Sequence, residues 1–291
     1  MSSAPESNKG SLATAVAGSL TPRRHLMRDS VSLPLQRVRA IVLRRELLRA
    51  LIQKDFETRY AGSVLGVLWT QLYPLLLLGV YSLVFAVIFK TAIPDFPIFL
   101  FTGIVLWNFF NTAVMSATNS VLGSAQLITR IGFPRELVPL AAVLTPLVDV
   151  ALSHLILIGA ALAFGVTPAW TWLALPPLLT LLVLLCIGIG LILSSAAVYL
   201  RDVRFFVEVG VLLLMFLSPI FYSEDAVPQS LHWLLVLNPL GVVISAYRHT
   251  FLSHVWPSLR IWSVLIALDA LVLWVGLNIF ARAQKGFPDA L

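Results

Sequence analysis

Six long apolar runs constrain this chain more than any other feature of its sequence. They cover, approximately, residues 64–89, 98–122, 137–165, 174–200, 205–222 and 261–281. A helix needs about 20 apolar residues to cross the hydrocarbon core of a bilayer. The longest run would extend roughly 40 Å as a helix, which is enough to cross with tilt. The sequence therefore predicts an all-α integral membrane protein with six transmembrane helices, in which internal prolines such as Pro146 and Pro219 mark kinks.

The composition agrees with a chain that lies mostly in lipid. Of the 291 residues, 59% are hydrophobic and only 12% are charged, whereas soluble domains carry about 25% charged residues. So few charges could not cover a water-facing surface, and six spans leave no room for a second globular domain. The net charge of +6 could suggest nucleic acid, but the basic residues flank the apolar runs, so no nucleic-acid partner is expected.

Two segments precede the first apolar run. Residues 1–38 are rich in Ser, Ala and Gly and are expected to form a disordered tail. Residues 39–63 show apolar positions at three- and four-residue spacing, with polar residues on the remaining face. The basic members of that face are Arg44, Arg45, Arg49 and Lys54. This pattern predicts an amphipathic helix that lies in the interface against anionic headgroups, ahead of a transmembrane domain over 64–291.

The basic residues also predict the orientation of the chain. With six spans both termini share one side, and that side receives 17 of the 20 Lys and Arg residues; the other side receives Lys90, Arg248 and Arg260. The positive-inside rule then places both termini in the cytoplasm. Five of the eight tryptophans fall at the predicted outer boundary, as an aromatic belt would: Trp170, Trp172, Trp233, Trp256 and Trp262.

The segment between the last two runs, residues 223–260, carries two apolar stretches that are too short to span. Asn238-Pro239 separates them. The pattern predicts two short re-entrant helices, which are allowed only where protein or a cavity shields the backbone. The alternative is a plain extracytoplasmic loop.

The sequence holds no recognisable catalytic or metal-binding motif. It lacks G-x-x-x-x-G-K-[ST], H-E-x-x-H, G-x-S-x-G and Cys/His metal spacing, and its one cysteine, Cys186, lies in an apolar run. We therefore predict no catalytic residue, no metal site and no ATP hydrolysis by this chain alone. Four ionisable residues lie within the spans: Asp149, His154, Glu208 and Asp269. They are scattered over three helices, which favours polar packing between helices over a catalytic pair.

Aromatic residues are plentiful in the first, second and fifth runs. Because aromatic faces stack on sugar rings, they are candidates for lining a passage for glycan; packing or contact with lipid is the alternative. These candidates are Tyr73, Tyr81, Phe85, Trp107, Phe109, Phe110, Phe216, Phe221 and Tyr222.

Five short motifs resemble the polysaccharide-export permeases of ABC transporters. They are KDFETRYAGSVLG at 54–66, followed by Trp69 and Pro74, then GFPREL at 132–137, YLRDV at 199–203, SPIFY at 218–222 and NPL at 238–240. Together they cover about residues 40–285 in the expected order. The O-antigen and teichoic-acid export permeases are the most similar, followed by the capsule exporters.

The resemblance implies a homodimeric channel in the bacterial inner membrane that works with two copies of a separate nucleotide-binding ATPase subunit. ATP and Mg²⁺ would bind to that partner, and this chain would hold no cofactor of its own. The substrate implied is a lipid-linked glycan, with lipopolysaccharide O-antigen first, and the remaining contacts would be membrane lipids.

The resemblance also implies roles for particular residues. The short helix between spans two and three, around 126–136, would dock on the ATPase, with the amphipathic helix at the same interface. Its contact residues would be Arg130, Phe133, Pro134, Arg135 and Glu136. The re-entrant pair would form an outer gate that contains Trp233, Asn238, Pro239 and Arg248.

Three alternatives stay open from the sequence. The first is a drug or small-lipid exporter of the same fold. The second is a membrane-embedded glycosyltransferase or ligase, which would need grouped acidic residues in a substantial aqueous loop; Glu224 and Asp225 are the only adjacent acidic pair. The third is a scaffold that transports nothing.

Overall fold

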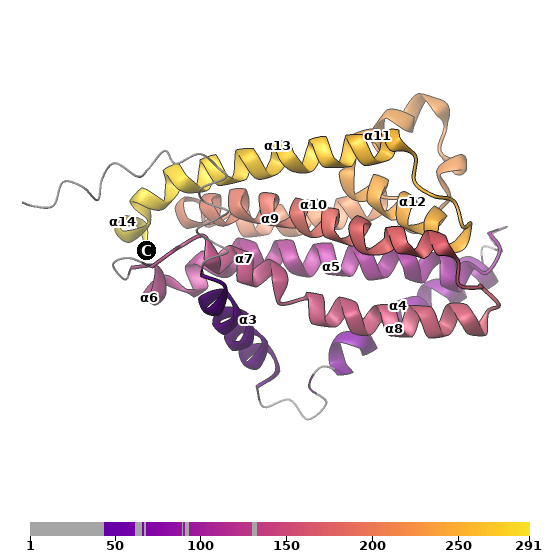
Figure 1. The fold of residues 1–291 in the computed structure, drawn as a ribbon, viewed down its shortest axis with the longest axis horizontal. Helices are drawn as coiled ribbons and strands as arrows, with labels where there is room; N and C mark the ends of the chain where they lie inside the picture. Colours follow the sequence, from indigo (N-terminus) through magenta and orange to yellow (C-terminus); the bar gives the residue numbers. More distant parts are fainter. Residues whose placement is uncertain (1–43, 62–65, 67, 89, 91–92, 130–132) are drawn as a thin grey trace, which may run out of the picture. The chain divides into compact units, whose positions relative to one another are not determined.

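The structure is a computed structural model that describes residues 44–61, 66, 68–88, 90, 93–129 and 133–291. The predicted tail (1–38), the start of the predicted amphipathic helix and Arg130 lie outside these residues. The described residues are mostly helical and contain no strand (Figure 1). This confirms the all-α class.

The helices of the first half belong to the amphipathic segment and the first three predicted spans. They are α3 (Arg45–Tyr60), α4 (Leu68–Ser82) with its π-helical continuation η2 (Leu83–Ile88), α5 (Phe96–Gly123), α6 (Ala125–Ile128), α7 (Leu137–Leu144) and α8 (Leu147–Ala163). The third predicted run is divided into α7 and α8 at Thr145-Pro146, where the predicted proline kink falls. Proline causes such breaks because it removes a backbone donor.

The second half contains three long helices and a group of short ones. They are η3 (Trp170–Ala174), α9 (Leu175–Tyr199), α10 (Val203–Leu217), η4 (Glu224–Ala226), η5 (Gln229–Leu231), α11 (His232–Leu237), α12 (Pro239–Leu252), α13 (Leu259–Ala283), η6 (Gln284–Gly286) and α14 (Phe287–Ala290).

Among the described residues, five helical segments are long and apolar enough to cross a membrane: Leu68–Phe85, Phe96–Gly123, Leu137–Ala163, Trp170–Tyr199 and Leu259–Ala290. The predicted fifth span is shorter than expected, because α10 has 15 residues and ends where Ser218-Pro219 interrupts it. The segments Gln229–Leu237 and Pro239–Leu252 form a bent pair with an angle of 99° between them. The break predicted at Asn238-Pro239 is therefore present, while the count of six spans stays a prediction.

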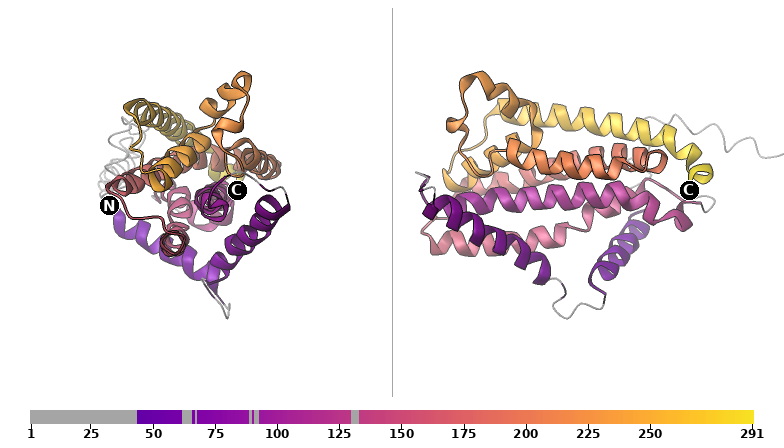
Figure 2. Two further views of the ribbon diagram at one scale, coloured as in Figure 1. Left: turned by 90° about the vertical axis from the view of Figure 1, so that its right-hand side faces the viewer. Right: turned by 180° about the vertical axis from the view of Figure 1, so that it is seen from behind.

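Helix α9 is the centre of the bundle and packs between α5 and α13 (Figures 1 and 2). Glycines make these contacts close. A β-carbon on Gly276 of α13 would lie 2.5 Å from the carbonyl oxygen of Gly188, and one on Gly190 would lie 2.7 Å from Cβ of Ala117 in α5. The hydrophobic effect does not drive helices together within lipid, so membrane helices associate through close packing. Small residues such as these glycines make that close packing possible.

Helix α3 stands apart from the bundle axis and packs against α7 (Figure 1). Leu51 is its buried residue, whereas the four basic residues predicted for its polar face are exposed. The helix is thus amphipathic over Arg45–Tyr60, and its position in the membrane interface stays a prediction.

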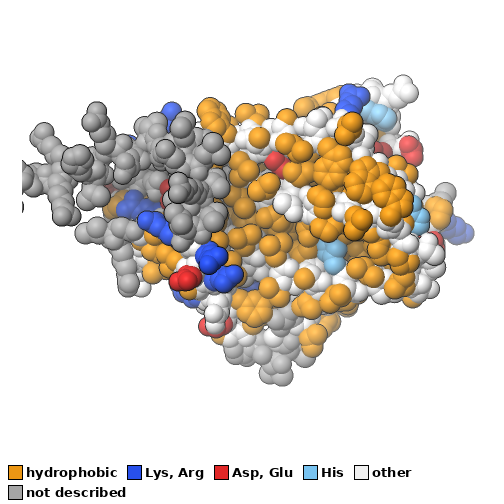
Figure 3. Space-filling view, viewed as in Figure 1, with side chains coloured by type: hydrophobic (Ala, Val, Ile, Leu, Met, Phe, Trp, Pro, Cys, Tyr) orange, Lys and Arg blue, Asp and Glu red, His pale blue; other side chains and the backbone are white. Residues whose placement is uncertain are grey.

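Apolar side chains cover much of the described surface on the face that Figure 3 shows. Large exposed examples are Leu155 on α8, Leu212 on α10 and Ile266 on α13. Such a surface is suited to contact with lipid tails rather than water.

Candidate functional site

The loop that precedes α7 is fastened to the C-terminal segment of the chain. Arg135 donates from Nε to the carbonyl oxygen of Ile128 at 3.0 Å and from Nη1 to the carbonyl oxygen of Gln284. The Gln284 side-chain amide donates to Glu136 Oε1 at 2.8 Å. Two of the five residues expected at the ATPase interface are thus bound within the chain, while Phe133 and Pro134 beside them are partly exposed.

A second contact ties the same segment to the end of α9. The Tyr199 hydroxyl donates to the carbonyl oxygen of Ala283 at 2.7 Å. Its ring also packs near Phe287, which meets Phe280 edge-on with ring centroids 5.5 Å apart. The motifs at 132–137 and 199–203 therefore meet on the C-terminal segment. Sequence reasoning missed this junction because three of its four hydrogen bonds end on backbone carbonyls, which leave no pattern in the sequence.

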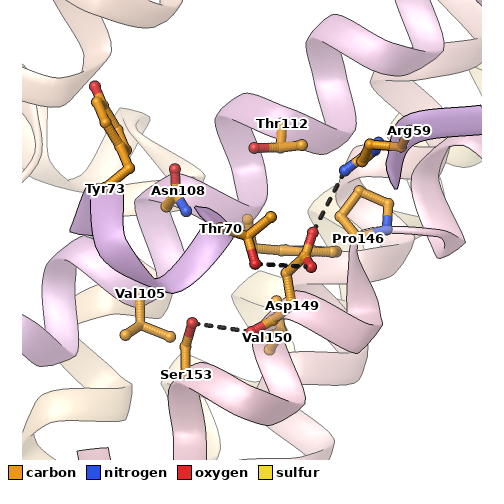
Figure 4. Close-up of a pocket in the computed structure, with 11 residues that line it drawn as sticks. Arg59, Thr70, Tyr73, Val105, Asn108, Thr112, Pro146, Asp149, Val150 and Ser153 are labelled. Atoms are coloured by element: carbon orange, nitrogen blue, oxygen red, sulfur yellow. Dashed lines mark hydrogen bonds and ion pairs between the residues drawn. The ribbon is translucent and has the colours of Figure 1, made fainter. Parts of the chain in front are cut away.

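A polar cluster joins α3, α4 and α8 around the carboxylate of Asp149 (Figure 4). Arg59 lies 3.4 Å from Oδ2, while the hydroxyls of Tyr60 and Thr70 donate to Oδ1 at 2.7 and 3.2 Å. Burial, together with the hydrogen bond to Asp149, raises the pKa of Tyr60 to about 12. Tyr60 therefore stays protonated at neutral pH and remains a donor to the carboxylate.

The cluster continues along α4 and borders a cavity. Gln71 donates to the backbone carbonyl of Asp149 at 3.1 Å and accepts from the Ser153 hydroxyl at 2.8 Å. The cavity, of about 170 Å³, is lined on its other sides by α4 and α5 residues that include Tyr73 and Asn108. Asp149 thus joins three helices, as expected of an intramembrane carboxylate that packs rather than reacts.

The other three ionisable residues of the spans do not share this cluster's contacts. His154 Nδ1 lies 2.8 Å from the carbonyl oxygen of Val150, and Glu208 is exposed on α10. Asp269 is buried on α13, and its Oδ2 has no hydrogen-bond partner among the described residues. Over the same part of the chain, no three His, Cys, Asp or Glu side chains are grouped as metal ligands would be.

Two of the four residues expected at the outer gate, Asn238 and Arg248, are buried. Arg248 is 7% exposed, and its Nη1 and Nη2 donate to the carbonyl oxygens of Pro219 and Ile220 at 2.6 and 3.2 Å. Its guanidinium also lies 3.5 Å from the ring centroid of Phe99. Arg248 therefore satisfies the carbonyls freed where α10 ends, and the gate role expected of it stays a prediction.

Asn238 caps α12 and connects two of the motifs. Its Oδ1 accepts from the Gly241 amide at 3.1 Å, and its Nδ2 donates to the Ser218 hydroxyl at 2.8 Å. The NPL and SPIFY motifs are thus in direct contact. Pro239 is partly buried, and Trp233 is exposed.

The candidate aromatic residues divide into two groups. Tyr81, Phe85 and Phe216 surround Phe221, with ring centroids 4.9, 5.6 and 5.9 Å from it. Tyr222 lies beside this aromatic cluster and donates to the carbonyl oxygen of Phe216 at 3.3 Å. Three further candidates are buried in the bundle, namely Trp107, Phe109 and Phe110, whereas Tyr73 is 54% exposed. Which of them line a channel stays a prediction.

Replacing Asn238 by alanine is expected to lower the free energy of unfolding by about 2 kcal/mol. Loss of a helix cap costs about 1 kcal/mol, and loss of the bond to buried Ser218 adds a similar amount. Thermal unfolding of the purified protein in detergent measures the effect. Ser258→Ala is the matched control, because Ser258 caps α13 from an exposed position with a longer bond of 3.4 Å; equal melting of Asn238→Ala and wild type would contradict the prediction.

Helical architecture and motif arrangement together define a membrane transport subunit. The chain belongs to the family described as ABC-2 type transporter, whose members match it over residues 46–252.

Among its relatives are permeases of polysaccharide export. The chain is 30% identical to the O-antigen export system permease protein RfbA of Myxococcus xanthus over 258 residues, which cover 87% of this chain and 98% of the relative. It is also 30% identical to an O-antigen export system permease protein RfbA of Klebsiella pneumoniae, over 84% of this chain and 95% of the relative. Identity falls to 24% with the polysialic acid transport protein KpsM of Escherichia coli, over 82% and 93% of the two chains.

Proposed function

We propose that this chain is the membrane subunit of an ATP-driven exporter that moves lipid-linked polysaccharide, with lipopolysaccharide O-antigen first, across the bacterial inner membrane. The observation that carries the proposal is the similarity to O-antigen export permeases along nearly the full length of both chains. Identity to the polysialic acid transport protein and to a capsule polysaccharide export protein is lower over a similar length, which favours O-antigen over capsule.

Energy for export would come from a partner, since the sequence holds no phosphate-binding loop. In this proposal, a homodimer of this chain binds two ATPase subunits, and each of those subunits binds ATP and Mg²⁺. The loop 133–136 would be the docking site. In its support, Phe133 and Pro134 are partly exposed, and Arg135 and Glu136 hold the loop in one place.

The proposed orientation places the C-terminal segment and α3 in the cytoplasm. In its support, 13 of the 20 Lys and Arg residues lie in the first 59 and the last 10 residues of the sequence. Membership of a transport family favours export over the ligase and glycosyltransferase alternatives.

Depletion of this protein in its host tests the proposal. We expect finished lipid-linked glycan to accumulate on the cytoplasmic side of the inner membrane, measured by accessibility to a glycan-binding lectin in intact and permeabilised spheroplasts. Normal surface glycan after depletion would refute the polysaccharide assignment and leave the drug or small-lipid exporter. Loss of glycan synthesis with no accumulated polymer would indicate an enzyme instead.

A further inference from the structure

One face of α5 differs from the rest of this helix. Between Ile98 and Val121 every residue of this helix is buried except seven, and six of the seven are polar; Met115 is the other. We name these six the α5 polar face: Asn108, Asn111, Thr112, Ser116, Asn119 and Ser120. Their spacing of three, four and one places them on a single side of the helix.

The polar face runs along the helix rather than forming an isolated spot. Residues 108–120 extend roughly 18 Å at the rise of an α-helix, more than half the hydrocarbon thickness. Many large exposed side chains of the neighbouring helices are apolar instead, for example Leu155 on α8 and Leu212 on α10, although Arg204 and Glu208 of α10 are exposed as well. The face is therefore a polar track, interrupted by Met115, on a bundle that otherwise exposes many large apolar side chains.

Three members of the face keep their hydrogen-bonding groups available. Elsewhere on α5, Thr102 and Thr118 donate to backbone carbonyls one turn earlier, each at 2.7 Å. Asn108, Asn111 and Thr112 make no side-chain hydrogen bond within the part of the chain that the structure describes. Polar groups without partners are costly in hydrocarbon, so this face requires water or a polar ligand.

A cavity lies against Asn108 and Thr112 of the polar face. Asn108 and Thr112 line this cavity together with Tyr73 of α4 (Figure 4). The cavity of about 170 Å³ has room for several water molecules or one sugar ring. Arg59 reaches the next turn of the face and donates to the Ser116 hydroxyl at 3.3 Å.

We propose that the α5 polar face lines the path of the exported glycan and hydrogen-bonds its hydroxyls, with Tyr73 beside it as a stacking surface. This inference rests on the function proposed above. Amides and hydroxyls are uncharged and both donate and accept, as sugar hydroxyls do. A track of such groups gives a hydrated polymer successive, weak contacts, and weak contacts at many sites let a substrate move on.

Cysteine accessibility tests whether the face is wet. Cys186 is the only cysteine and is buried, so Cys186→Ala gives a background for single cysteines at Asn108, Thr112 and Ser116. We expect a charged, membrane-impermeant methanethiosulfonate to label these positions in everted vesicles, and to label them more slowly when the host synthesises the glycan. Cysteines at Leu155 and Ile266, exposed on apolar surface, are controls that should stay unlabelled.

Two results of this experiment would overturn the proposal. One is protection of the α5 cysteines equal to that of the lipid-facing controls. The other is cross-linking of an α5 cysteine to its copy without labelling by the charged reagent, which would show a dry contact between two chains.

A substitution pair tests whether the glycan uses these groups. The variant Asn108→Leu with Thr112→Val keeps side-chain size but removes the hydrogen-bonding groups, and we expect export to fall about tenfold, equivalent to about 1.4 kcal/mol. Thr118→Val, on the buried side of the same helix, should leave export unchanged. Export by both wild type and the double variant would refute this inference alone, whereas no glycan export by wild type would refute the proposed function itself.

Discussion

Replacing Gly276 by leucine is expected to abolish accumulation of the folded protein. A β-carbon at this position would lie 2.5 Å from the carbonyl oxygen and 3.3 Å from Cα of Gly188, whereas carbon atoms in good contact stand about 3.5–4.0 Å apart. Because the obstacle is backbone, no rotamer change relieves it, and α13 must move away from α9. The cost should reach about 3 kcal/mol or more, the upper end for overpacking. Fluorescence-detected size exclusion of detergent extracts measures the loss.

Gly159→Leu is the matched control for this prediction. Gly159 lies on α8, and a β-carbon there would meet nothing within 4 Å. Leucine also has a higher helix propensity than glycine by up to about 1 kcal/mol, so this variant should accumulate at least as well as wild type. Equal profiles for Gly276→Leu and Gly159→Leu would show that α9 and α13 do not pack as described.

The class of the fold could be predicted from the sequence because lipid leaves few choices. Apolar runs of span length must be helical, since every backbone group has to be satisfied within the segment. The breaks at Pro146 and at Asn238-Pro239 were also readable, as proline interrupts the helical hydrogen bonds. The length of the fifth run was misjudged, because Pro219 ends α10 outright rather than bending it.

The junctions between helices could not be read from the sequence. The sequence predicts Arg248 as a basic residue of the outer gate, whereas in the structure its guanidinium donates hydrogen bonds to the carbonyl oxygens of Pro219 and Ile220. Likewise, aromatic content drew attention to Trp107 and Phe110, which are buried. The α5 polar face could not be predicted from the sequence, because its polar residues are dispersed in an apolar run. That they share one side of the helix follows from the burial of the residues between them.

The second large effect is expected at the loop before α7. Arg135→Ala removes two charge-assisted hydrogen bonds to backbone carbonyls, one to Ile128 and one to Gln284, each worth about 1.5 kcal/mol or more. The loop would then be free to leave the C-terminal segment while the bundle, which packs through α5, α9 and α13, keeps its fold. If this loop docks on the ATPase, transmission of ATP hydrolysis requires it in a fixed position. We therefore expect glycan export to fall at least tenfold with normal accumulation of the protein.

Two further variants test whether the effect comes from the two hydrogen bonds of Arg135, which we call the Arg135 clamp. Gln284→Ala removes the side-chain bond to Glu136 but keeps the backbone carbonyl that accepts from Arg135, so export should fall by less than in Arg135→Ala. Arg135→Lys should lie close to Arg135→Ala, because a single ammonium cannot reproduce the fork that reaches both carbonyls. Export is read from surface glycan, protein level from immunoblots, and ATPase activity from membranes that contain the complex.

An Arg135→Ala variant that exports normally would exclude the Arg135 clamp from coupling, and one that fails to accumulate would make Arg135 a determinant of folding instead. Coupling is the assignment that predicts full accumulation, continued ATP hydrolysis and little surface glycan together.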